Sequence, residues 1–116
     1  MKIEVLKTKI SHIKVTSSHK NDEGVIRMSK SLMEEGNLVN YEKVMIINED
    51  NGGSANPKFA FVESFEKDVA HRDISTPSTI ATFNDTITII SVGTATVDEP
   101  IKEPILINMK PFVNYD

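Results

Sequence analysis

Several side chains near the start of the chain are of types that carry acid–base or anion-binding chemistry. A lysine such as Lys9 can hold a carboxylate as a point charge, or act as a base or nucleophile when it is desolvated. His19 lies in the polar run 17–23, and histidine is the side chain that changes charge closest to neutral pH. Asp22 and Glu23 end that run and can serve as general bases. The alternatives are a solvated lysine on a strand edge and an ordinary polar surface loop.

The sequence predicts neither a metal site nor thiol chemistry. His12 lies on the same expected strand as Lys9, but an offset of three places the two side chains on opposite faces. A set of His, Asp and Glu ligands is conceivable, yet its spacing matches no established metal pattern, so no metal site is predicted. The chain contains no cysteine, which excludes disulfides, a thiolate nucleophile and a zinc thiolate site.

Short apolar or alternating runs must position these side chains. They are separated by turn-forming residues, a pattern typical of a small, mainly β barrel or sandwich. The runs cover residues 3–6, 10–15, 25–28, 44–47, 59–62, 86–92 and 105–107. The turn residues at 51–53 predict a hairpin, and the charged stretch 98–104 is expected to lead to a terminal edge strand.

One helix is expected directly after the third run. Ser29 can cap its first turn, and Leu32 and Met33 can face inward. Gly36 can end the helix in a left-handed conformation.

Composition limits the class of protein. The 116 residues predict one domain spanning 1–116. A net charge of −4 provides no basic field, which argues against nucleic acid as a partner. No apolar run approaches the roughly 20 residues of a membrane span. The first residues read as a strand rather than a signal peptide, so we expect a cytoplasmic protein.

The stretches 6–16 and 22–26 resemble the N-terminal region of the pyruvoyl-dependent aspartate decarboxylases. The resemblance continues to about Gly52 and is most specific at Lys9, at residues 14–16 and at Glu23-Gly24. It implies a six-stranded double-psi β-barrel with one or two short helices. It also implies a homotetramer with sites between neighbouring subunits, and it places Lys9 beside the cleavage and substrate site.

Several positions depart from the family pattern. The family cleaves a Gly-Ser bond and converts the serine to a pyruvoyl group, but here Val25 follows Gly24. Valine has no hydroxyl to attack the preceding carbonyl and nothing to eliminate, so no pyruvoyl cofactor is expected. The segment 53–59 lacks the family's arginine, for which Lys58 can replace only the charge, and Phe59 falls where a tyrosine is expected. The family's small residues near 75–79 have also changed.

Three functions remain open. The first is a repurposed small-molecule enzyme of lyase, isomerase or cyclase type in a specialised biosynthetic pathway. The second is a non-catalytic pseudoenzyme or regulatory subunit, and the third is a true aspartate 1-decarboxylase making β-alanine. For the first, we predict Lys9, His19, Asp22 and Glu23 as catalytic residues. We predict Lys9, Thr16 and Lys58 as contacts to a small anionic metabolite.

Overall fold

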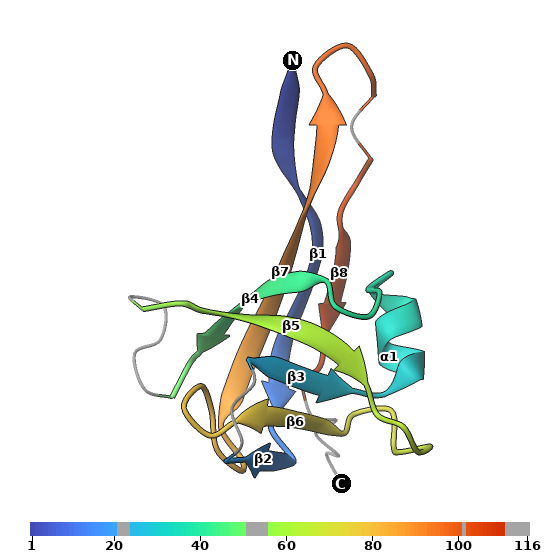
Figure 1. Cartoon of the computed structure of the whole chain (residues 1–116). Helices are drawn as coiled ribbons and strands as arrows, with labels where there is room; N and C mark the ends of the chain where they lie inside the picture. Colours follow the sequence, from blue (N-terminus) through green and yellow to red (C-terminus); the bar gives the residue numbers. More distant parts are fainter. Residues whose placement is uncertain (21–23, 51–55, 101, 111–116) are drawn as a thin grey trace, which may run out of the picture.

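The computed structural model describes residues 1–20, 24–50, 56–100 and 102–110. Within these residues, eight strands and one short helix form the fold (Figure 1). In chain order they are β1 (Lys2–Lys14), β2 (Ser17–His19), β3 (Val25–Met28), α1 (Lys30–Glu35), β4 (Lys43–Asn48), β5 (Lys58–Ser64), β6 (Ile74–Pro77), β7 (Thr86–Thr96) and β8 (Ile105–Asn108). The strands form one sheet in the order β2-β6-β3-β5-β4-β7-β1-β8.

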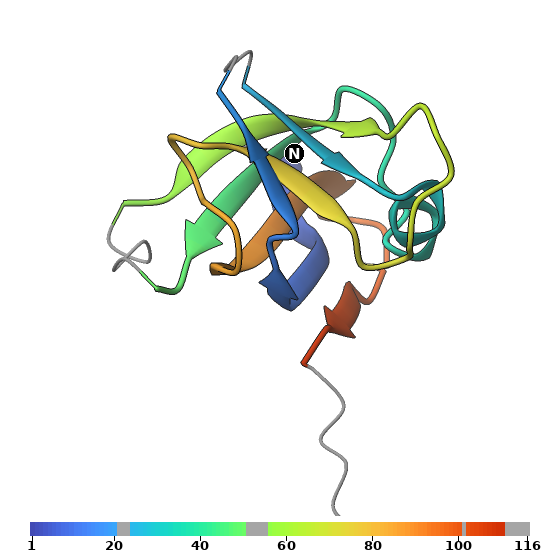
Figure 2. The ribbon, with the colours of Figure 1, turned by 90° about the horizontal axis from the view of Figure 1, so that it is seen from below.

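The sheet curves round on itself, as the view from below shows (Figure 2). The buried apolar side chains form one core cluster. Alternation along the strands places apolar side chains inward: Ile26 and Met28 of β3 are fully buried, whereas Val25 and Arg27 are half-buried. The largest buried side chains are mostly β-branched, which suits a curved and tightly packed sheet. The fully buried isoleucines are Ile10, Ile13, Ile26, Ile46, Ile74, Ile87 and Ile89.

The outer parts of β1 and β7, residues 2–6 and 92–96, extend beyond the rest of the sheet as an antiparallel arm (Figure 1). The sequence predicted two strands at 3–6 and 10–15, but the structure joins them into β1 with irregular register near Leu6 and between Ile10 and Ile13. His12 has a left-handed backbone with φ of 61° at the second irregularity. Between Ile10 and Ile13, β1 has one residue more than β7, and this bulge interrupts the alternation of side chains. The prediction that Lys9 and His12 face opposite sides assumed an unbroken alternation, which β1 does not have.

The helix is confirmed with one correction at its end. The Ser29 side chain accepts a hydrogen bond from the Leu32 backbone at 3.1 Å, and Leu32 and Met33 are buried. Gly36 is not left-handed; its φ is −86°, and Asn37 takes the left-handed role with φ of 53°. Glycine is favoured at 36 because an added Cβ would come within 3.2 Å of the Thr8 side chain.

Two strands were missed by the sequence patterns. Residues 17–19 were expected in a polar loop, yet they form β2, which pairs in parallel with β6. β6 is buried along all four of its residues and so shows no alternation. Its start is fixed by Thr16, whose hydroxyl donates to the Ile74 carbonyl at 3.0 Å and accepts from the Ile74 amide at 2.9 Å.

The remaining predicted connections agree with the structure where it describes them. β8 lies at the edge of the sheet and pairs in parallel with β1, as expected for a terminal edge strand. β4 and β5 pair as antiparallel neighbours, while the turn at 51–53 lies outside the described residues. In the part of the chain that the structure describes, none of the helices is long and apolar enough to cross a membrane.

A partly buried ion pair links the loop after α1 to the arm. Lys7 Nζ lies 2.8 Å from Glu42 Oε1, and the Ser91 hydroxyl donates to the other carboxylate oxygen. Burial alone would raise the pKa of Glu42, but hydrogen bonds from Lys7, Ser91 and the Val39 amide outweigh it and hold the pKa below its ordinary 4.5. The stability from this carboxylate is therefore present above pH 4.5 and is lost as the pH falls through the lower folded-state pKa.

We expect Glu42→Gln to lower the free energy of unfolding at neutral pH by about 1–2 kcal/mol, since it removes charge-assisted hydrogen bonds at a partly exposed site. The variant should also lose less stability than the parent below pH 4.5. Thermal unfolding from neutral to acidic pH measures both effects. Glu4→Gln is the control, because Glu4 is exposed and has no partner among the described residues. Equal pH profiles for Glu42→Gln and the parent would contradict the assignment.

Candidate functional site

His19 lies at the end of β2, where three strands meet. Its Nδ1 is 2.9 Å from the Ser75 hydroxyl on β6, and its Nε2 is 3.1 Å from the Val25 carbonyl oxygen on β3. Ser75 is 7% exposed and His19 is half-buried. The parallel pairing of β2 with β6 and the antiparallel pairing of β3 with β6 bring these residues together from positions far apart in the sequence.

These contacts assign the protons of the neutral imidazole. A carbonyl oxygen can only accept, so Nε2 carries the hydrogen that points at Val25. Nδ1 therefore holds a lone pair and accepts the proton of the Ser75 hydroxyl. Ser75 and His19 form a polarised hydroxyl and a base, held by the backbone of the strand that contains position 25.

Arg27 adds a cation. It lies two residues after Val25 on β3, so the two side chains are on the same face of the strand. It lies opposite Ser75 in the β3–β6 register and opposite Glu63 in the β3–β5 register. Its Nε donates to Glu63 Oε2 at 3.1 Å, and Glu63 is its only side-chain partner among the described residues. The terminal guanidinium nitrogens remain available to a carboxylate, which they match as a two-pronged donor.

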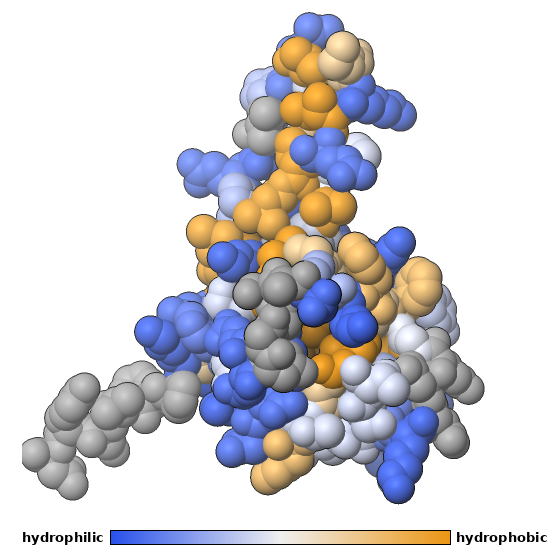
Figure 3. All heavy atoms as spheres, turned by 90° about the vertical axis from the view of Figure 1, so that its left-hand side faces the viewer, coloured by the Kyte–Doolittle hydropathy of each residue, from blue (hydrophilic) through white to orange (hydrophobic). Residues whose placement is uncertain are grey.

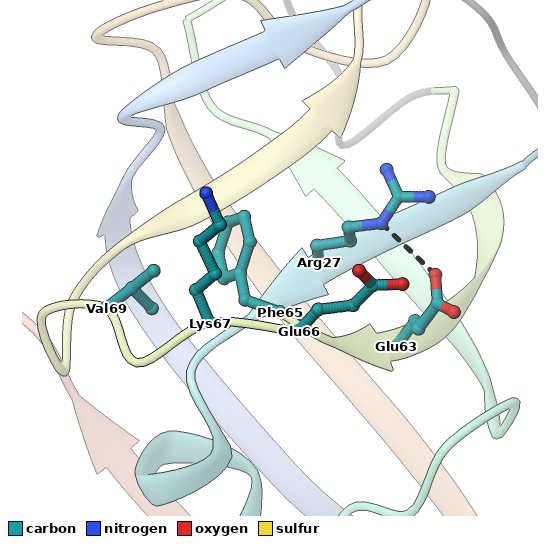
Figure 4. Close-up of a pocket in the computed structure, with 6 residues that line it drawn as sticks. All are labelled: Arg27, Glu63, Phe65, Glu66, Lys67 and Val69. Carbon is teal, nitrogen blue, oxygen red and sulfur yellow. Dashed lines mark hydrogen bonds and ion pairs between the residues drawn. The ribbon is translucent and has the colours of Figure 1, made fainter.

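A hollow of about 430 Å³ opens beside Arg27 (Figure 4). Its lining includes Arg27, Lys67 and Phe65. In Figure 4 the Phe65 ring lies beside Lys67, and the carboxylates of Glu63 and Glu66 lie beside Arg27. The volume of the hollow suits a small metabolite. The two cations offer places for an anionic group, and the two carboxylates offer places for an amine.

The other residues predicted for the site are distributed differently. Thr16 uses its hydroxyl on the Ile74 backbone, so it fixes the start of β6 next to Ser75. Lys58 is exposed at the start of β5, and Lys9 is exposed on β1 between β7 and β8. In the described part of the chain, no hydrogen bond or ion pair joins either lysine to His19. Asp22 and Glu23 lie outside the described residues.

The bond between Gly24 and Val25 is held within the sheet. Gly24 has a left-handed φ of 71°, which favours glycine, and its carbonyl accepts from the Phe61 amide at 2.7 Å. Val25 is half-buried and pairs with Phe61 of the neighbouring strand β5. Both carbonyls that flank the Val25 side chain are therefore occupied, one by the Phe61 amide and the other by His19.

The sequence predicted a role for His19 and singled out Val25, but it gave no role to Arg27 and marked Ser75 only as part of a segment that departs from the family pattern. Arg27 could have been recognised, because the second residue after Val25 on a strand shares its face. The contact of Ser75 with His19 was not predicted, since it depends on the pairing of two strands 58 positions apart that local patterns do not reveal.

The sequence of the chain is similar to those of known proteins. The model of the family described as aspartate decarboxylase matches residues 1–110. An aspartate 1-decarboxylase of Clostridium botulinum (strain ATCC 19397 / Type A) is 32% identical over 127 residues, which cover 100% of this chain and 95% of that protein. An aspartate 1-decarboxylase of Cytophaga hutchinsonii is 46% identical over 52 residues, and the chain spans 45% of that relative.

A solved structure supports the architecture. The computationally designed protein msDPBB_sym2, whose name denotes a double-psi β-barrel, matches 77% of this chain and 99% of its own. Its TM-score is 0.54 at 18% sequence identity, so the likeness concerns the fold alone. Together with the strands described above, it confirms the mainly β, double-psi β-barrel class expected from the sequence.

Proposed function

Because the chain belongs to the aspartate decarboxylase family, we propose that it is an enzyme of small carboxylates that works without a pyruvoyl group. The observation that carries this proposal is the hydrogen-bonded chain from Ser75 through His19 to the carbonyl of Val25. It puts acid–base groups beside the position where the family's cofactor is expected. The reaction proposed is of lyase, isomerase or cyclase type, in a specialised biosynthetic pathway of the cytoplasm.

The residues at the cleavage position do not fit a pyruvoyl group. Making that group requires a hydroxyl that attacks the carbonyl of Gly24 and is afterwards eliminated. Val25 offers only two methyl groups on its β-carbon. No step is therefore assigned to a pyruvoyl ketone, and the proposed chemistry uses side chains that the chain already carries.

In the proposed reaction, Arg27 binds a substrate carboxylate through its terminal nitrogens while Glu63 holds the guanidinium from the Nε side. Ser75 passes its proton to His19 Nδ1 as its oxygen accepts a proton from the substrate, so the substrate loses one proton and the imidazole gains one. The Val25 carbonyl keeps Nε2 protonated, so the imidazole does not turn away from Ser75. The half-buried setting of His19 strengthens these interactions by limiting access of water.

A shared site would explain why Lys9 does not meet His19 within one chain. The proposed assembly is a homotetramer in which Lys9 of one subunit reaches the substrate bound beside His19 of its neighbour. Apolar side chains are exposed on the arm and on the edge strand β8, and burying them between subunits would favour such an assembly. Apolar surface follows the arm in the space-filling view (Figure 3). Val92 is 55%, Val97 56% and Leu106 66% exposed.

We expect subunit mixing to reveal this sharing. Lys9→Ala and His19→Ala should each be inactive as homo-oligomers, because each lacks one side of every site. In an evenly mixed oligomer, about a quarter of the sites would combine an intact Lys9 with an intact His19, which should restore measurable turnover. Co-expression with two affinity tags provides the mixed oligomer, and light scattering gives its mass. A 12.9 kDa monomer in solution, or no recovery in a verified mixed oligomer, would contradict the shared site.

Incubation with L-aspartate distinguishes this proposal from two other functions, true aspartate decarboxylation and a non-catalytic role. The curated relatives are named aspartate 1-decarboxylase, which favours L-aspartate as the first compound to try. Formation of β-alanine and carbon dioxide would support true decarboxylation. Binding of carboxylates without turnover of any would support a non-catalytic or regulatory protein. Another product, lost in His19→Ala, would support the proposal made here.

A further inference from the structure

A second Ser-His contact lies on the helix side of the molecule, separate from His19. Ser31 Oγ is 2.8 Å from His71 Nδ1, and His71 Nε2 is 2.9 Å from Glu35 Oε2. Ser31 and Glu35 both belong to α1, where a spacing of four places them on one face. His71 reaches them from the segment between β5 and β6.

The backbone around this group is fixed from both sides. The Ser29 hydroxyl donates to the His71 carbonyl at 2.8 Å while accepting from the Leu32 amide, so the residue that caps α1 also anchors His71. His71 itself lies in a turn, in which the Asp73 amide donates to the Ala70 carbonyl at 2.9 Å. The imidazole is thus held against the helix by its main chain as well as by its ring nitrogens.

The proton assignment follows the same logic as at His19. An ionised Glu35 only accepts, so His71 Nε2 carries a hydrogen and the neutral ring presents its Nδ1 lone pair to Ser31. Ser29 has already donated its only hydroxyl proton, so it can only accept from Ser31, at the longer distance of 3.2 Å. Serine hydroxyl, imidazole and carboxylate therefore stand in the order that activates a serine nucleophile.

From this arrangement we propose that Ser31, His71 and Glu35 form an acyl-transfer site for small, uncharged esters. Ser31 is exposed, and a hollow of about 310 Å³ adjoins it. This volume lies at the small end of ligand sites, which suits a short acyl chain. Lys30 and Lys67 line the hollow together with Glu34 and Asp68, so two positive and two negative charges leave no preference for a charged substrate.

The proposed reaction balances without any further reagent than water. Ser31 Oγ attacks the ester carbonyl as its proton moves to His71 Nδ1, and the carbon–oxygen bond to the alcohol breaks as that proton passes to the leaving oxygen. Water then attacks the acyl-serine, giving up its proton through His71, and the acid leaves as Ser31 regains its hydrogen. Glu35 is a positioning residue, because it touches His71 and neither the ester nor the nucleophile.

The test uses 4-nitrophenyl acetate as substrate and a fluorophosphonate as a covalent label of the full chain. We expect the label on Ser31, and we expect Ser31→Ala and His71→Gln to release nitrophenolate at least about tenfold more slowly than the parent. This is less than the 10²–10⁴-fold that a well-placed general base contributes, because the side chains of His71 and Glu35 are 43% and 49% exposed. Ser64→Ala is the matched control, with a serine hydroxyl outside both Ser-His pairs.

Circular dichroism establishes that each variant is folded before its rate is compared. Nitrogen-15 spectra of the histidine ring give a readout that does not depend on activity: the parent should show His71 protonated at Nε2, and Glu35→Ala should lose that preference. A label found on other residues while Ser31 stays unlabelled, or equal rates for the parent and folded Ser31→Ala, would overturn the proposal.

Discussion

Replacing His19 with glutamine is expected to lower turnover of a small carboxylate substrate by about 10²- to 10⁴-fold, the usual contribution of a positioned general acid or base. Glutamine can still donate a hydrogen bond to the Val25 carbonyl, so it preserves part of the contact between β2 and β3. It cannot take up a proton from Ser75 at neutral pH. The loss should therefore appear in the rate and leave the fold intact.

Proton NMR of incubations with amino and hydroxy dicarboxylic acids, beginning with L-aspartate, measures this effect. His12→Gln is the matched control, because His12 lies on β1 and contacts Asn108 at the edge of the sheet. Ser75→Ala should lower the rate as His19→Gln does, and the double variant should be little worse than either single one, since the two residues act as a unit. Unchanged turnover in folded His19→Gln would remove His19 from the mechanism.

Much of the barrel could be predicted because its strands have one buried face. Alternation marks β3 and β4, where every second side chain is buried. The cap at Ser29 was equally readable, since the helix start needs a side-chain acceptor for its free amides. These features depend on residues close together in the chain.

The rest depends on contacts between distant residues. The alternation pattern did not reveal β6, because this strand is buried along its whole length and ends in proline, a residue more often found in edge strands. β2 exists only because β6 pairs with it, so its polar residues looked like a loop. Ser31 and His71 are 40 positions apart, and no local pattern could have joined them.

The family resemblance and the structure place Lys9 in different surroundings. The resemblance placed it beside the cleavage position, while the structure places it on β1 with neighbours in β7 and β8. Both statements hold if the site forms between subunits. In the proposed assembly, Lys9 of one subunit and His19 of its neighbour then belong to one site.

The chain is proposed to work without cleaving itself between Gly24 and Val25. Intact mass spectrometry of the purified protein, with and without a carbonyl-reactive hydrazine, tests it most directly. We predict one species at the full-chain mass near 12.9 kDa, unchanged by the hydrazine, because Val25 has no hydroxyl to start the cleavage. Two fragments divided between Gly24 and Val25, with a hydrazine adduct on the second fragment, would contradict the claim.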